Sequence, residues 1–240
     1  MKTRVCILLT LTVLMLAAVW FSCKDEPVDT MDKDTGRPKI VLDPGHGGED
    51  GGAVSSDGTR ESMINLAVSS RTDSLLGLFG WSCVLTRTGE DLEYPPSAIT
   101  VKKRKQADLE RRVNQVDATP NAVLISIHQN KYPAEGPRGA QVLYRDEAES
   151  IRLAGLMQDR LSACLGADMR SSIPISDSIY LMRKVHCPAI LIECGFLSNP
   201  EESRLLCSEA YQTKLALCIA CACAEYAKEW ENAYGQGGKG

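Results

Sequence analysis

Four polar side chains stand at or near the carboxyl ends of apolar, strand-like segments. His46 and His128 each follow such a segment, Glu193 closes another, and Glu61 begins the helical pattern after the glycine-rich stretch behind His46. Two imidazoles and carboxylates at one edge match the side chains of a hydrolytic zinc site. The third metal ligand is expected to be a carboxylate or another histidine, and Glu61 is the natural candidate.

Each residue also has a simpler interpretation. A histidine such as His46 at a strand end is often only hydrogen-bonded, and Glu61 could be a helix N-terminal charge favoured by the helix dipole. The stretch Gly45–Gly52 could cradle a phosphate, but it lacks the lysine and the spacing of a P-loop. The joint placement of these residues at strand ends favours a metal site.

Alternating strand and helix patterns surround these residues. Five short runs rich in Val, Ile, Leu and Cys predict buried strands: 39–43, 82–86, 122–126, 140–144 and 189–193. Amphipathic patterns predict helices over 61–79, 104–116, 147–165 and 208–230. This alternation predicts a single α/β domain with a mainly parallel, twisted sheet flanked by helices. Sites in such sheets gather beyond the carboxyl ends of the strands.

The chain ends differ from this domain in composition. Lys2 and Arg4 precede an apolar run from Val5 to Ser22, which indicates export. A retained anchor in 1–23, a cleaved signal and lipidation at Cys23 all remain open. Residues 24–37 are expected to be a polar tether, 38–234 the catalytic domain and 235–240 a disordered tail. The net charge of -4 gives no case for nucleic-acid binding.

Cysteine is frequent, with ten residues in 240, and six of them lie between positions 187 and 223. Cys218, Cys221 and Cys223 superficially suggest a metal cluster. On a helix, however, Cys223 points away from the other two, and no histidine lies nearby. We therefore expect these cysteines to act as small buried hydrophobes. An oxidising exterior would permit disulfides, but the sequence does not pair them.

Four motifs together resemble the zinc-dependent N-acetylmuramoyl-L-alanine amidases of the amidase-3 type, over residues 39 to 230. The motifs are Leu-Asp-Pro-Gly-His-Gly-Gly at 42–48, Glu61 through Asn65-Leu66, Ser-Ile-His-Gln-Asn at 126–130, and Ile-Glu-Cys-Gly-Phe-Leu-Ser-Asn at 192–199. The resemblance implies that His46, Glu61 and His128 bind Zn²⁺ and that Glu193 is the catalytic carboxylate. The implied substrate is peptidoglycan, cut between muramic acid and L-alanine. Zinc would acidify a water and polarise the scissile carbonyl.

A narrower similarity is to the spore-former branch that trims cortex peptidoglycan. It rests on the apolar start, on Arg104–Val113 and on Ile179–Met182. It implies a sporulation role at the spore envelope, with localisation through the N-terminal membrane segment or through a partner such as a sporulation lipoprotein. The run Gln129–Lys131 departs from the family pattern and is expected to touch the site rim.

Two other functions remain as alternatives, a zinc peptidase cutting within the stem peptide and an inactive zinc-binding wall protein; the presence of Glu193 argues against the inactive form.

Four further residues or runs have two interpretations each. His186 is either a substrate contact or a structural loop histidine, and Arg87 either pairs with a peptide carboxylate or forms a surface salt bridge. The run Lys102–Lys105 either attracts anionic wall polymer or is a solvated helix start. Asp43 is expected to organise the loop or to support a ligand, not to bind metal itself.

Overall fold

The computed structural model describes residues 37–166 and 170–234, all within a compact unit that spans Gly36–Gly240. These residues form a six-stranded sheet in the order β2-β1-β3-β6-β4-β5. All neighbouring strands run parallel except β4 and β6, which are antiparallel. The strands are β1 (Lys39–Pro44), β2 (Val84–Leu85), β3 (Ala122–Asn130), β4 (Gln141–Tyr144), β5 (Ile173–Pro174) and β6 (Ala189–Phe196).

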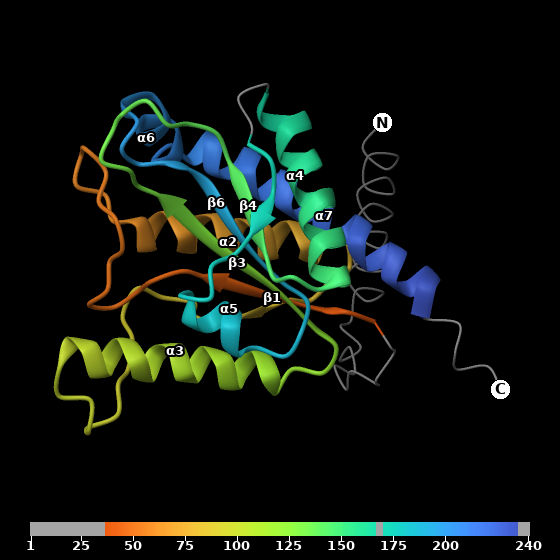
Figure 1. The fold of residues 1–240 in the computed structure, drawn as a ribbon, viewed down its shortest axis with the longest axis horizontal. Helices are drawn as coiled ribbons and strands as arrows, with labels where there is room; N and C mark the ends of the chain where they lie inside the picture. The colour runs from red at the N-terminus through yellow and green to blue at the C-terminus, as the bar shows by residue number, and fades with distance from the viewer. Residues whose placement is uncertain (1–36, 167–169, 235–240) are drawn as a thin grey trace, which may run out of the picture. The chain divides into compact units, whose positions relative to one another are not determined.

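Helices cover both faces of the sheet (Figure 1). One face packs against α2, α4 and α7, and the other packs against α3 and α5. The predicted α/β domain with a mainly parallel sheet is therefore confirmed. The helices are α2 (Glu61–Leu78), α3 (Val101–Asp117), α4 (Ala148–Leu165), α5 (Tyr180–Lys184), α6 (Pro200–Leu206) and α7 (Glu209–Tyr234).

The two faces follow from the alternation of side chains along β3. Val123, Ile125 and Ile127 belong to the larger core under α2, α4 and α7, whereas Leu124 belongs to the smaller core under α3 and α5. Because side chains alternate along a strand, His128 lies on the same face as Leu124. The site face is therefore the one that α3 and α5 cover.

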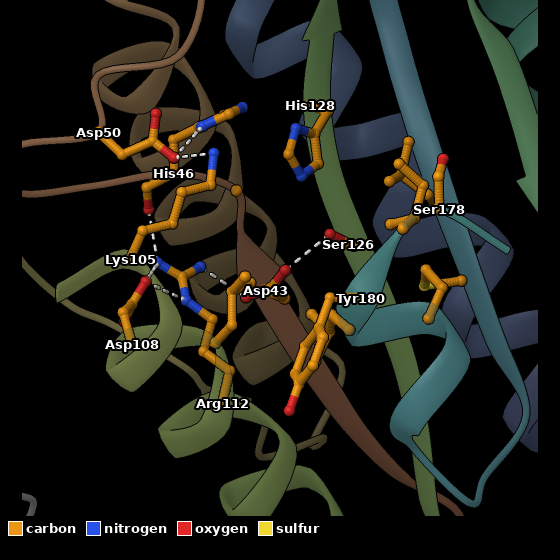
Figure 2. A pocket seen from close by; sticks show the side chains of 16 residues that line it. Asp43, His46, Asp50, Lys105, Asp108, Arg112, Ser126, His128, Ser178 and Tyr180 are labelled. Carbon is orange, nitrogen blue, oxygen red and sulfur yellow. Dashed lines mark hydrogen bonds and ion pairs between the residues drawn. The ribbon is translucent and has the colours of Figure 1, made fainter. Parts of the chain in front are cut away.

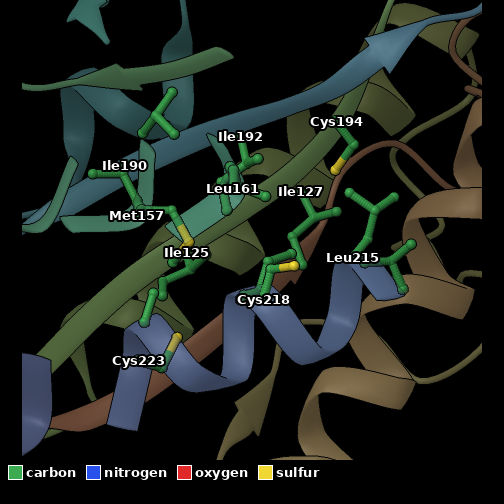
Figure 3. Close-up of a cluster of buried hydrophobic side chains, with 14 of the residues drawn as sticks. Ile125, Ile127, Met157, Leu161, Ile190, Ile192, Cys194, Leu215, Cys218 and Cys223 are labelled. Carbon is green, nitrogen blue, oxygen red and sulfur yellow. The ribbon is translucent and has the colours of Figure 1, made fainter. Parts of the chain in front are cut away.

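The cysteines of α7 pack as expected. Cys218 and Cys223 are buried in the larger core among β-strand side chains (Figure 3), while Cys221 is half-buried. The eight described cysteines are all free thiols; three are buried, four are half-buried, and Cys164 is exposed.

Several element boundaries differ from the sequence predictions. Strands β3 and β6 run past the predicted ends, so that His128 and Glu193 lie inside them. The short elements β5, α5 and α6 were not predicted, because segments of two to seven residues carry too little periodicity. The helix predicted over 61–79 ends at Leu78, and Phe79 is 50% exposed.

None of the helices in the described ranges is long and apolar enough to cross a membrane. The predicted anchor, the tether up to residue 36 and the predicted tail lie outside the described residues.

Candidate metal centre

The strand register brings three of the predicted site residues to one edge of the sheet. His128 of β3 is paired with Glu193 of β6, so their side chains share a face. His46 lies in the loop two residues beyond β1, which is the other neighbour of β3. Glu61 is the first residue of α2, the helix that packs on the opposite face of the sheet, and it reaches the site from the start of that helix.

His46, Glu61 and His128 form a compact set of possible metal ligands. Glu61 Oε1 lies 3.0 Å from His128 Nδ1 and 3.4 Å from His46 Nε2. One ligand atom from each residue lies within 4.8 Å of the other two. No other such group of His, Cys, Asp and Glu occurs in the described ranges. Two imidazoles and one carboxylate are a ligand set that zinc hydrolases use, so the donor atoms fit this metal.

Hydrogen bonds hold the Glu61 carboxylate in place from two sides. Its Oε2 accepts from Ala53 N at 2.8 Å, and its Oε1 accepts from Gln129 N at 3.1 Å and from Asn65 Nδ2 at 3.3 Å. Burial opposes ionisation, but the contacts with His128 and His46 outweigh it and lower the pKa of Glu61 to about 2. Glu61 is therefore an anion at neutral pH.

Two glycines leave the space that the site needs. A Cβ on Gly45 would lie 2.1 Å from His128 Nε2, so that any side chain there would displace the imidazole. Gly52 has φ +68°, and a Cβ there would lie 2.5 Å from Glu61 Oε2. The glycine-rich stretch therefore packs against the possible metal ligands.

Glu193 has the properties of a proton-transfer group. Its Oε2 is buried and has no hydrogen-bond partner among the described residues. Burial raises the pKa of Glu193 to about 7; the charge of Glu61 adds to the rise, while His128 and His46 oppose it. A bound dication would draw this pKa down again. A buried, unpartnered carboxylate oxygen beside the two imidazoles is suited to accept a proton from a reacting group.

Two buried arginines clamp the backbone that carries His46. Arg112 is 1% exposed and donates to Pro44 O and His46 O. Arg87 is 4% exposed and donates to Pro44 O and Gly45 O. His46 has a backbone φ of 60°, which residues other than glycine rarely adopt. The arginines bind three consecutive carbonyl groups and so hold the loop in this unfavourable backbone conformation.

Asp43, in β1, supports the same loop from within the sheet. It accepts from Thr86 Oγ1 at 2.6 Å. It also accepts from Ser126 Oγ at 2.6 Å and from Arg112 Nη1 at 2.8 Å (Figure 2). Through Arg112 it reaches the carbonyl of His46, which agrees with the expected loop-organising role.

Three other sequence expectations have clear outcomes. Arg87 is buried against backbone carbonyls and pairs with Glu90 Oε1 at 3.1 Å, so its ion pair is not the surface salt bridge that was expected. The side chain of Gln129 is 3% exposed and donates to Asn65 Oδ1 at 3.1 Å, so it supports Glu61 and does not line the rim. His186 is a loop histidine that contacts Asp117 Oδ2 at 3.0 Å, three residues before β6 begins.

Sequence reasoning missed Asp50 and Arg112. Asp50 lies four residues after His46, and its Oδ2 is 3.1 Å from His46 Nδ1. The spacing of four residues in a glycine-rich loop could have indicated that Asp50 contacts His46. Arg112 had none, because a charged residue on an amphipathic helix is ordinarily solvated.

Comparison with known proteins decides the family. Residues 40–225 match the model of Amidase_3, N-acetylmuramoyl-L-alanine amidase. The chain belongs to this family. The enzyme is an N-acetylmuramoyl-L-alanine amidase, and it carries the four motifs of that family within the matched range.

Two relatives illustrate where this amidase lies in the family. It is 39% identical over 181 residues to the germination-specific N-acetylmuramoyl-L-alanine amidase of Bacillus subtilis, covering 75% of this chain and 76% of that one. It also resembles the structure of the CwlD amidase from Clostridioides difficile in complex with the GerS lipoprotein, with a TM-score of 0.76 and 33% identity. That similarity covers 80% of this chain and 99% of the CwlD chain.

A more distant relative has the same activity in its name. The AmiA amidase of Escherichia coli is 27% identical over 230 residues, covering 83% of this chain and 80% of AmiA.

Proposed function

We propose that this amidase is zinc-dependent, with His46, Glu61 and His128 as the zinc ligands and Glu193 as the general base and acid. The observation that carries the proposal is the convergence of three ligand atoms within 4.8 Å of one another beside Glu193. The ligand set is one that leaves zinc open to a water and a substrate carbonyl.

The metal would supply a Lewis acid that lowers the pKa of water and polarises the scissile carbonyl. Glu193 then takes the proton of the attacking water on its carboxylate and gives it to the leaving amine nitrogen. The unpartnered Oε2 of Glu193 is the atom suited to this transfer. His46 and His128 must be neutral to bind a metal. The negative charge of Glu61 would balance part of the charge of the metal ion.

Four single variants test these roles. His46→Ala, His128→Ala and Glu61→Ala each remove one ligand, so zinc content and turnover should fall together. Glu193→Gln keeps the ligands, so zinc should stay bound while turnover falls by roughly 10²–10⁴-fold. The measurements are zinc per chain and turnover on purified peptidoglycan. Loss of zinc in Glu193→Gln with retention in Glu61→Ala would mean that the two carboxylates have exchanged roles.

The products identify the bond that is cut. Family membership favours hydrolysis of the amide between muramic acid and L-alanine over cleavage within the stem peptide. Digestion should therefore create free L-alanine amino termini and leave intact muramic acid on the glycan. New termini only at later stem residues would indicate the peptidase alternative.

We further propose a role in spore cortex maturation outside the cytoplasm, assisted by a lipoprotein. The support is the germination-specific relative and the CwlD structure with the GerS lipoprotein. Deleting the gene in its host should give spores that form but fail to germinate, with unchanged vegetative growth. A growth or cell-separation defect without a spore phenotype would contradict this role.

A further inference from the structure

A line of polar contacts connects His46 with the exposed start of α3. Asp50 Oδ2 lies 3.1 Å from His46 Nδ1 and 2.7 Å from Lys105 Nζ. Figure 2 shows dashed contacts from one oxygen of the Asp50 carboxylate to both side chains. The same oxygen therefore contacts both the imidazole and the ammonium group.

The loop backbone fixes Asp50 in this place. Gly47 N donates to Asp50 O at 2.8 Å, and Asp50 N donates to Gly47 O at 3.1 Å. This pair of hydrogen bonds closes the turn from Gly47 to Asp50, so the carboxylate returns to the ring of His46, four positions earlier. A carboxylate at neutral pH only accepts hydrogen bonds, so His46 Nδ1 is the donor.

The direction of that hydrogen bond selects the imidazole tautomer. With the proton on Nδ1, the lone pair of His46 is on Nε2, the nitrogen that faces Glu61 at 3.4 Å. Histidines that bind metals commonly donate their other ring N–H to a carboxylate, which fixes the ring orientation and increases its basicity.

We propose that Asp50 and Lys105 are positioning residues that set the tautomer and orientation of His46 for metal binding. Asp50 acts on the imidazole, and Lys105 holds Asp50. The inference rests on the proposed zinc site and adds to it two residues that lie outside the ligand set.

The position of α3 explains why Lys105 can do this. Arg104 pairs with Glu49 and Lys105 with Asp50, so adjacent residues of the helix meet adjacent residues of the loop. Farther along the helix, Arg112 binds His46 O. Helix α3 therefore holds both the backbone of His46 and, through Asp50, its ring. The basic start of α3 is thus more than a solvated helix end.

Zinc affinity of the whole protein, measured by competition with a chelator, tests the proposal. Asp50→Asn should bind zinc about 10- to 100-fold more weakly, the range for lost outer partners of a metal ligand. Lys105→Met should cause a smaller loss, below about tenfold, because a half-exposed ion pair contributes little by itself. The matched control is Lys103→Met, which removes the same charge from an exposed position of the same helix. Its zinc affinity should be unchanged.

A double variant tests whether Lys105 acts through Asp50. Adding Lys105→Met to Asp50→Asn should cause no further loss of zinc affinity. Equal losses in Lys103→Met and Lys105→Met would reduce the lysine effect to general charge and overturn its part. Thermal unfolding of the metal-free variants checks folding, and the Lys105→Met comparison remains decisive should Asp50→Asn fail to fold.

The two proposals can fail separately. A wild-type protein that binds no zinc would overturn the zinc site itself. A wild-type protein that binds zinc, together with an Asp50→Asn variant of equal affinity, would overturn only the positioning role.

Discussion

At the scale of single residues, the candidate metal site depends on charged groups that contact no ligand atom. Arg112 and Asp43 form an ion pair at 2.8 Å in which both side chains are 2% exposed. Each also binds other buried groups, Arg112 the carbonyls of Pro44 and His46, and Asp43 the hydroxyls of Thr86 and Ser126. The pair therefore joins β1, β3, α3 and the residue that follows β2 beneath the loop of His46.

Breaking this pair should be strongly destabilising. Arg112→Met leaves a buried carboxylate without its counter-charge, which costs about 3–5 kcal/mol of unfolding free energy. Urea unfolding measures the loss. The double variant Arg112→Met with Asp43→Asn should lose less than the sum of the single variants, because neither then leaves an unpaired charge. Strict additivity would show that the two groups do not act as a pair.

The same carboxyl group predicts a pH dependence of stability. Burial opposes ionisation of Asp43, but Arg112, Ser126 and Thr86 outweigh it and lower the pKa to about 2 from an ordinary value of 3.8. Since the folded pKa lies below the unfolded one, the contribution is complete above about pH 4 and is lost as the pH falls to about 2. It amounts to about 2 kcal/mol.

Unfolding free energy measured between pH 6 and pH 2 checks this window. The difference between wild type and Asp43→Asn should shrink as the pH falls, because protonation makes the wild-type group resemble the amide. A difference that stays constant over the range would contradict the assignment.

At the scale of elements, the site exists because the loop after β1 passes closely over β3. Gly45 follows the last residue of β1, and its N–H donates to Ile127 O of β3 at 3.0 Å. The backbone at this point runs directly against the ring of His128. The approach of these two elements therefore places His46 next to His128.

Gly45→Ala tests that close approach. The added methyl group would lie 2.1 Å from His128 Nε2, so the imidazole must move. A displacement of about 1 Å can reduce turnover by on the order of 100-fold, and zinc content should fall with it. Gly136→Ala is the control, since a Cβ there meets no atom within 4 Å. Full activity of Gly45→Ala would mean that the loop can move away from β3.

At the scale of the whole molecule, the catalytic domain and the N-terminal segment are predicted to be separable. The described elements start at Lys39 and end at Tyr234, and every hydrogen bond named around the site lies between them. The domain limits 38–234 and the retained anchor in 1–23 remain predictions.

Fractionation tests this separation. The full chain should partition with membranes, because Lys2, Arg4 and the apolar run of 5–22 favour a retained anchor. A chain that begins at Pro38 should be soluble and should keep full turnover. Full-length protein with an intact N-terminus found wholly in the soluble fraction would contradict the anchor.

Much of the architecture was accessible from local patterns in the sequence. Buried parallel strands appear as continuous apolar runs in the sequence. The four long helices, α2, α3, α4 and α7, were predicted to within a few residues at each end. The antiparallel orientation of β4 and the short elements β5, α5 and α6 were not accessible. The direction of a strand depends on how the chain enters the sheet, which a local pattern does not record. A strand of two residues is also too short to show an alternation of apolar and polar side chains.

The sequence by itself determined the family through four contiguous motifs and the α/β class through alternating apolar patterns. It also predicted His46, Glu61, His128 and Glu193 as the site residues. Only the tertiary structure decided which distant groups support them. Arg112 meets Asp43 across 69 residues, and Lys105 meets Asp50 across the segment that contains α2 and β2. Such contacts leave no periodic trace along the chain. They form only when packing brings a helix onto a sheet, and burial then turns an ordinary surface charge into a hydrogen-bonding partner of the site.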